Sequence, residues 1–594
     1  MALKINGLKR WYSTGMLVLL VGLMAIAMVG CGDGDDDSSG DAAPVVSTAT
    51  TQPAAAAAPT AKAAAPTAKP APPEPADDKY GGTLAFAYFR APTSPDGYQS
   101  SGGYENFFIW ANNEPILAMD TGGGYDQEAS LASAFEVLDD GLRVRLTIRE
   151  GVQFQGGLGE MTAEDVAWSM NRWFEEGALG CRGCGGLFSA VSEVVVVNPT
   201  TVDLILETLD SNIVVKLMGR ETIIHSKKHW EAVGGLDSHK SQPIGTGPYK
   251  LTDWAVGDSI EYERHDDWWQ GKPYADKVKV ITISETRTRL AALQTGQVNV
   301  AFLQSEMIPA AREDGDVDVW AGGYGIEGWR WNPALAPLND IRVRRALVKS
   351  VDREALNTSV YLNSMNINTS CILAPGPLAV DCSDIWDGEW FGFDVDAAKV
   401  LIEEYAADTG QTLPLQMIGA VEKRPDRQQL NEFLQGTWRE IGVEYVFETT
   451  TNVSASSDVM NKCETHQQST GSGIVSHRQL EGNYHSKGSG AYPRKCAELG
   501  HDPLVAADQA IQDQLDKLLD DAAATVDPDA RATLYNEADK LGTQYAFATF
   551  PLMNRQNFFG CNNKITGGCG NEDEGININR GEGFFRQSDF WVKK

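Results

Sequence analysis

Residues 139–170 read DDGLRVRLTIREGVQFQGGLGEMTAEDVAWSM, and the interpretation of the whole chain starts from this stretch. Apolar and polar side chains alternate from Leu142 to Ile148, which predicts a strand with one buried and one solvent-exposed face. An antiparallel pairing is the simplest arrangement for that pattern. Thr162 then stands three residues before Asp165, a variant capping box, so a helix is expected to begin there.

The expected helix carries its apolar residues along one stripe. Members of that stripe follow one another at steps of four, three and one: Val166, Met170, Trp173 and Phe174. In this arrangement Ser169 and Arg172 face solvent. Strand, glycine-rich loop and helix together predict a small lobe that mixes both kinds of element.

The order of these elements resembles a segment of the family 5 solute-binding proteins of ABC importers. The matching features are Asp140-Gly141, Arg149-Glu150-Gly151-Val152, Phe154, Gly156 and Thr162-Ala163-Glu164-Asp165-Val166. The resemblance implies an α/β, periplasmic-binding-protein-like two-lobe (Venus-flytrap) fold with an extra smaller domain and mixed sheets. Members of the family carry peptides, nickel chelates or oligosaccharides. Because the matching residues are expected in turns, caps and packing, they indicate the family and not the ligand.

The same resemblance extends along the chain. It includes Gly81-Gly82-Thr83-Leu84, the stretch Pro243 to Tyr249, Asp267-Trp268-Trp269, and Pro337 to Ala346. Its order implies lobe I at 80–125, 244–332 and 546–594, a small extra lobe II at 126–243, and lobe III at 333–545. About 515 residues from Tyr80 onward are more than one core usually serves, which agrees with several lobes.

The first 79 residues are expected to lie outside this fold. Three basic residues precede an apolar run from Met16 to Val29, which is shorter than the ~20 residues of a spanning helix and typical of a signal peptide over residues 1–30. Met28-Val29-Gly30-Cys31 resembles a bacterial lipobox, which implies lipidation of Cys31; an ordinary signal peptide with an incidental cysteine is the alternative. Residues 31–79 are rich in Ala, Pro and Thr and predict a disordered tether. The protein is therefore expected outside the cytoplasm, lipid-anchored to the bacterial cell membrane and facing the periplasm or cell surface.

Charge and cysteine content limit the partners. The chain carries a net charge of −31; residues 1–30 hold three bases, and residues 31–79 hold eight acids and three bases, so about −29 remains on the body. Such acidity argues against nucleic acid and anionic lipid surfaces as partners, and a monomer is expected. Setting Cys31 aside leaves eight cysteines, an even number that suits an oxidising exterior. Although 105 pairings exist, neighbours in the sequence favour Cys181 with Cys184, Cys371 with Cys382, Cys463 with Cys496, and Cys561 with Cys569.

Nine residues are candidates for contact with a solute. Tyr88 and Arg90 follow the first expected strand, at an edge where open α/β sheets bind ligands, and Tyr104 lies on the next segment. Trp329 and Trp331, two positions apart, share one face of a strand expected to cross between lobes. Where the resemblance fades, between Cys463 and Cys496, the polar and aromatic residues are His477, Arg478, Glu481 and Tyr484. Packing or solvation is the alternative for each of them.

Motifs for catalysis are missing from the sequence. It contains no P-loop, H-E-x-x-H or G-x-S-x-G, the eight histidines lack a metal-ligand spacing, and the glycine pattern at 323–328 runs into Pro333 instead of a helix. No enzyme activity, cofactor or metal is expected. The first hypothesis is a tethered protein that captures a short peptide or, next, an oligosaccharide, and delivers it to ABC permease and ATPase subunits. A sensor of the same fold, and an exported hydrolase using His477 or His485, are the alternatives.

Overall fold

A computed structural model describes residues 78–92, 94–98, 106–119, 125–174, 188–372, 379–450, 453–472, 477–488, 492–501, 504–545, 549–569 and 587–594. The chain divides into two compact units, Met1–Pro73 and Glu74–Lys594, and all of these residues belong to the second. None of the helices formed by them has the length and apolarity to cross a bilayer. Several predictions fall outside the described residues: the signal segment, Cys31, tether residues 32–77, Tyr104, Cys181, Cys184 and the side chains of His477 and Arg478.

The largest sheet in the described part of the chain has eleven strands. Ten follow the order β10 (Tyr249–Ala255), β11 (Ser259–Arg264), β12 (Lys277–Thr282), β1 (Thr83–Tyr88), β13 (Val300–Leu303), β19 (Thr549–Asn562), β14 (Val317–Trp331), β18 (Gln467–Ser472), β16 (Leu415–Glu422) and β17 (Val443–Thr450), and β15 (Asn366–Ile367) pairs with β19. We name β10, β11, β12, β1 and β13 the first half-sheet, and β18, β16 and β17 the second half-sheet. In each half one strand, β1 or β16, is parallel to both of its neighbours.

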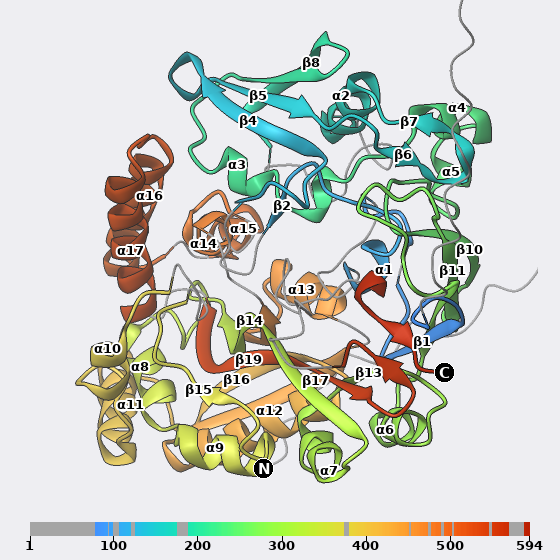
Figure 1. The fold of residues 1–594 in the computed structure, drawn as a ribbon. Coiled ribbons are helices and arrows are strands. Elements are labelled where there is room, and N and C mark those ends of the chain that lie inside the picture. Colours follow the sequence, from blue (N-terminus) through green and yellow to red (C-terminus); the bar gives the residue numbers. More distant parts are fainter. Residues whose placement is uncertain are drawn as a thin grey trace, which may run out of the picture. The chain divides into compact units, whose positions relative to one another are not determined.

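Two long antiparallel strands, β14 and β19, join the halves (Figure 1). β19 pairs with β13 on its other side, and β14 pairs with β18. The glycine pattern at 323–328 lies inside β14 and is not followed by a helix, as the sequence predicted. Any change in the relative orientation of the two half-sheets must therefore bend these two strands.

A separate four-stranded antiparallel sheet has the order β4 (Ala132–Leu138), β5 (Arg143–Ile148), β9 (Thr201–Leu206) and β8 (Val191–Asn198). The strand predicted from the alternating pattern is confirmed as β5, and Val144, Leu146 and Ile148 are buried. Leu142, just before the strand, is 40% exposed. The predicted capping box is also confirmed, since Thr162 accepts a hydrogen bond from the Asp165 N–H and the Asp165 carboxylate accepts one from the Thr162 N–H.

The predicted exposure of Ser169 and Arg172 is wrong, because both are 0% exposed. Helix α2 (Ala163–Asn171) is covered on a second side by the segment around His225, whose carbonyl accepts a hydrogen bond from the Ser169 hydroxyl at 3.2 Å. Arg172 begins a 3₁₀ turn (Arg172–Phe174), so the stripe expected of one continuous helix does not apply to it.

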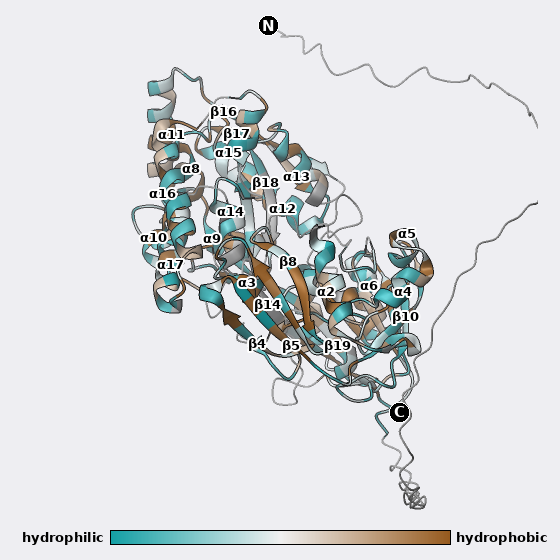
Figure 2. Ribbon diagram, turned by 90° about the horizontal axis from the view of Figure 1, so that it is seen from above, coloured by the Kyte–Doolittle hydropathy of each residue, from teal (hydrophilic) through white to brown (hydrophobic). Residues whose placement is uncertain are grey.

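The remaining helices cover these sheets and connect their strands. They are α1 (Asn106–Ile109), α3 (Ile213–Lys216), α4 (Lys227–Val233), α5 (Leu236–His239), α6 (Thr286–Gln294), α7 (Ile308–Glu313), α8 (Ile341–Lys349), α9 (Arg353–Val360), α10 (Ser383–Asp387), α11 (Val395–Thr409), α12 (Pro425–Glu440), α13 (Val453–Asn461), α14 (His477–Tyr484), α15 (Tyr492–Glu498), α16 (Ala506–Ala523) and α17 (Pro528–Gln544). Figure 2 shows hydrophilic residues on the outer helices α11, α16 and α17. Apolar residues of the second half-sheet pack under α8, α11 and α12 in one large core.

Candidate functional site

The carboxyl ends of β1 and β16 bring two opposite charges together. Arg90 follows β1 by two residues, and Glu422 is the last residue of β16. Their guanidinium and carboxylate form an ion pair although 332 positions separate them in the sequence. Because β1 belongs to the first half-sheet and β16 to the second, this pair connects both halves. Ligands of open α/β sheets bind at the carboxyl ends of strands, so we place the candidate site here.

Four more charged side chains extend this ion pair into a network. The Nε of Arg424 donates to Oδ1 of Asp426 at 2.7 Å, and Nη1 of Arg427 lies 2.5 Å from Oε1 of Glu327 on β14. Glu327 and Arg427 are 1% and 2% exposed. We name the six residues the charged cluster; it contains three cations and three anions: Arg90, Glu327, Glu422, Arg424, Asp426 and Arg427.

The charged cluster lies in surroundings from which most water is excluded. Burial by itself would lower the pKa of Arg424, but the Asp426 carboxylate raises it above its ordinary value. Burial, reinforced by Glu327, raises the pKa of the Tyr361 hydroxyl well above its ordinary value. The Oε2 atom of Glu422 is buried and has no hydrogen-bond partner among the described residues. The carboxylate is paired with Arg90 through its other oxygen, and this second buried acceptor favours a cationic or hydrogen-bond-donating ligand group.

Sequence reasoning identified only Arg90 in this cluster. A signal for four of the others was present in the sequence. The stretch Glu422-Lys423-Arg424-Pro425-Asp426-Arg427 follows an apolar strand, is rich in charged residues and contains the proline that begins α12. Glu327 gave no comparable signal, because it stands alone in a strand among glycines and aromatic residues. Its burial against Arg427 follows only from the pairing of β14 with strands from distant parts of the chain.

The aromatic candidates lie in hydrophobic cores. Trp329 and Trp331 are both 0% exposed, with ring centroids 5.4 Å apart, and Trp329 also meets Trp438 at 5.4 Å. Tyr88 is 2% exposed and packs edge-on against Phe108. In this structure these residues have packing roles, and contact between any of them and a solute stays a prediction.

Glu481 and Tyr484 lie on α14, where burial also dominates. The Glu481 carboxylate accepts hydrogen bonds from Asn212 Nδ2 at 3.0 Å and from the Tyr535 hydroxyl. Burial raises the pKa of Glu481 above its ordinary value. Tyr484 is 1% exposed and belongs to the core formed with α16 and α17. Glu481 therefore links the segment before α3 to two helices that are more than 260 positions away.

Six cysteines form disulfides in the described residues. The bonded pairs are Cys371 with Cys382, Cys463 with Cys496, and Cys561 with Cys569, at Cα–Cα separations of 5.2, 5.7 and 5.8 Å. These separations lie within the usual range for disulfides, and the pairs are those that sequence proximity favoured.

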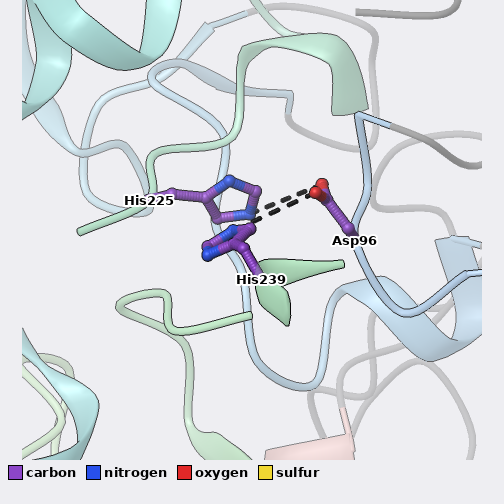
Figure 3. Close-up of side chains that lie close together, drawn as sticks. All are labelled: Asp96, His225 and His239. Atoms are coloured by element: carbon purple, nitrogen blue, oxygen red, sulfur yellow. Dashed lines mark ion pairs between the residues drawn. The ribbon is translucent and has the colours of Figure 1, made fainter. Parts of the chain in front are cut away.

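A second group of functional side chains lies in the core beside the small sheet. The Asp96 carboxylate faces the rings of His225 and His239, and all three residues are 0% exposed (Figure 3). One potential ligand atom from each lies within 4.8 Å of the others. These are the described residues most suited to holding a metal ion. Sequence reasoning missed them because 129 positions separate Asp96 from His225, and no short spacing signals the cluster.

Comparison with known sequences identifies the family. The model of bacterial extracellular solute-binding proteins, family 5 (middle), matches residues 127–488, more than half of the chain. Heme-binding protein A of Haemophilus influenzae is 25% identical over 345 residues, covering 54% of this chain and 61% of that relative. The dipeptide-binding protein of Escherichia coli K12 is 24% identical over 334 residues, covering 53% and 62%. The matches thus span about three fifths of these curated relatives' own length.

Comparison with solved structures establishes the fold. The periplasmic binding protein DppA from Helicobacter pylori, in complex with the peptide STSA, superposes with a TM-score of 0.71 at 18% identity, covering 87% of this chain and 99% of that one. The oligopeptide-binding protein AppA from Bacillus subtilis, in complex with a nonapeptide, gives 0.70 at 20% identity, covering 87% and 100%. The expected two-lobe periplasmic-binding-protein fold is confirmed. The relatives and neighbours named above are all binding proteins, and the chain itself belongs to the bacterial extracellular solute-binding proteins of family 5.

Proposed function

We propose that this protein captures a short peptide between two closing lobes and delivers it to the permease and ATPase subunits of an ABC importer. The names of two relatives and two structural neighbours support a peptide, since they describe dipeptide, oligopeptide or peptide-bound proteins. An oligosaccharide ranks second. Ligand binding favours the closed form by shifting a population between open and closed arrangements.

The ion pair between Arg90 and Glu422 is the observation that carries the choice of a peptide. A peptide with free termini carries an ammonium and a carboxylate, the same two charges that this ion pair contains. When the lobes separate, this ion pair breaks, and a peptide offers both of its charges again: its ammonium binds Glu422 and its carboxylate binds Arg90. A neutral sugar offers neither charge, so it would not supply a cation to the buried Glu422 carboxylate.

The N-terminal segment supports attachment to a membrane. We propose that residues 1–30 are removed, that Cys31 is lipidated, and that residues 31–79 form a tether to the body. Two or three acyl chains would hold the protein stably, since a single chain binds only marginally. The body then divides, in this proposal, into lobe I at 80–125, 244–332 and 546–594, lobe II at 126–243, and lobe III at 333–545.

The test uses protein carrying Cys31→Ala, which stays unacylated. Its melting temperature is measured with tri- and tetrapeptides with free termini, with the same peptides N-acetylated or C-amidated, with xylo-oligosaccharides and with nickel chelates. We expect free peptides to raise it most, peptides with one blocked terminus to raise it less, and sugars and nickel chelates to leave it unchanged, because a ligand of the folded state stabilises that state. Blocking either terminus removes one charge-assisted hydrogen bond of about 1.5–3 kcal/mol, which corresponds to roughly tenfold or more in affinity.

Two variants locate the binding site. Glu422→Gln should weaken binding of the free peptide and leave binding of the N-acetylated peptide unchanged, because that peptide has no ammonium to lose. Glu263→Gln is the matched control, since Glu263 is exposed and its carboxylate pairs with Lys250 at 3.3 Å, away from the charged cluster. Equal shifts with free and fully blocked peptides, or shifts with sugars alone, would contradict the proposal.

A further inference from the structure

We propose that Asp96, His225 and His239 bind a divalent first-row transition metal ion, with Zn²⁺ as the expected ion. Two imidazoles and one carboxylate are a common zinc ligand set, which leaves one position of a tetrahedral ion for a water molecule. The residues come from three segments: the loop after β1, the segment before α4, and the end of α5. Figure 3 shows the carboxylate directed at both rings.

The distances suit an ion between the side chains better than direct contact. Asp96 Oδ1 lies 3.9 Å from His225 Nε2, and Asp96 Oδ2 lies 4.0 Å from His239 Nε2. Both separations are too long for hydrogen bonds. A tetrahedral zinc ion with bonds of about 2.1 Å holds its ligand atoms roughly 3.4 Å apart, so a small inward movement would complete the site.

The ligand atoms are not used elsewhere in the described structure. Asp96 Oδ2, His225 Nε2 and both ring nitrogens of His239 are buried without a hydrogen-bond partner among the described residues. Both imidazole rings are 0% exposed, in surroundings that disfavour a charged ring. The neutral ring is the form that binds metals.

Arg172 is the one cation beside this group in the described residues, and its positive charge would oppose a metal ion unless other groups stabilise it. Its guanidinium lies over the ring of Trp230 at 4.1 Å and that of Tyr98 at 4.7 Å, so aromatic faces stabilise its charge. Its Nη1 is 3.3 Å from His225 Nδ1, and its Nη2 is 4.0 Å from Asp96 Oδ2. A metal on Nε2 requires the proton of the neutral ring on Nδ1, so Arg172 must turn from His225 toward the carboxylate, where it can orient the ligand.

The site would fix the loop that carries Arg90. Asp96 lies six residues after Arg90, and its backbone is already ordered locally, because its Oδ1 accepts from the Tyr98 N–H at 2.9 Å. A metal ion would attach this loop to the core around α2, α4 and α5 independently of any solute. Metal binding at this site therefore does not depend on the proposed peptide binding.

The metal content of the purified protein tests the proposal directly. Protein carrying Cys31→Ala is purified without chelators from zinc-supplemented cells, and its metals are quantified by mass spectrometry. We expect close to one zinc ion per chain, and a near-complete loss in Asp96→Asn and in His239→Gln. His265→Gln is the control, because His265 is also buried but its ring bonds to the Gly247 carbonyl at 3.2 Å, outside the cluster; this variant should keep its zinc.

A second measurement avoids dependence on variants that fail to fold. Metal-free wild-type protein is titrated with Co²⁺, and we expect the intense visible bands of a tetrahedral ion with nitrogen ligands, which disappear when Zn²⁺ is added. The melting temperature should rise with Zn²⁺. Wild-type protein without zinc, Co²⁺ or a thermal response would overturn the proposal, as would folded Asp96→Asn and His239→Gln proteins with unchanged zinc content.

Discussion

Trp329 shows how a residue suited to binding can instead be required for stability. Its indole is fully buried between Trp331 and Trp438. We predict that Trp329→Ala lowers the free energy of unfolding by about 3–5 kcal/mol, because it removes buried apolar surface and leaves a cavity. Denaturant unfolding measures this loss, and Phe393→Ala is the control, since Phe393 is 57% exposed and should change stability by about 0.5 kcal/mol or less. If Trp329→Ala were as stable as wild type and had lost only ligand affinity, the result would instead support stacking of Trp329 on the solute.

Glu481 makes stability depend on pH. Burial raises its pKa above the ordinary value of 4.5, so between 4.5 and the raised value the folded protein binds more protons than the unfolded chain. Stability contributed by this group is therefore lost as pH rises through that window. We predict that Glu481→Gln gains in melting temperature relative to wild type as pH rises from about 4.5 to 8. Glu263→Gln, an exposed control, should follow wild type; parallel curves for Glu481→Gln and wild type would contradict the prediction.

At the scale of elements, the sequence predicted local features and missed their surroundings. The alternation that identified β5 and the capping box of α2 are set by neighbouring residues, so both could be recognised. The burial of Arg172 could not, because it depends on Trp230 and Tyr98, which reach it from other parts of the chain. The charged cluster could be recognised only in part for the same reason: the run at 422–427 is local, but Arg90 in the loop after β1 and Glu327 in β14 reach it from distant parts of the chain.

Two glycines, one in the second half-sheet and one in helix α12, give a matched prediction. A Cβ on Gly419 in β16 would lie within 3 Å of the Tyr445 hydroxyl and Gln467 Oε1, and that hydroxyl is fixed by hydrogen bonds to Asn431 and Gln467 at 2.6 Å. Gly419→Ala should therefore destabilise the protein by about 1–3 kcal/mol. Gly436 lies in α12 with open space around it, so Gly436→Ala should stabilise by about 0.4–1 kcal/mol. Chemical denaturation compares them, and changes of the same sign would be inconsistent with this packing.

At the scale of the whole body, two contacts connect segments that lie far apart in the sequence. The ion pair of Arg90 and Glu422 is one such contact. Another lies before α3, where the Ser211 N–H donates to the Ala523 carbonyl at 3.3 Å and Asn212 donates to Glu481. Since β14 and β19 are the strands that join the half-sheets, we predict that these contacts control opening about them.

Asn212→Asp tests the contact with Glu481 without changing its shape. The substitution replaces a donated hydrogen bond by two carboxylates facing each other in a buried site, at a cost of roughly 1–3 kcal/mol. We predict a larger radius of gyration at neutral pH by small-angle X-ray scattering, and a return to the wild-type value on acidification, because one shared proton removes the repulsion. Asn198→Asp adds the same charge in a turn where the side chain already acts as an acceptor, so it should leave the radius unchanged. If Asn212→Asp also scatters like wild type at neutral pH, the contact does not control opening, and the ion pair of Arg90 and Glu422 becomes the principal link between the halves.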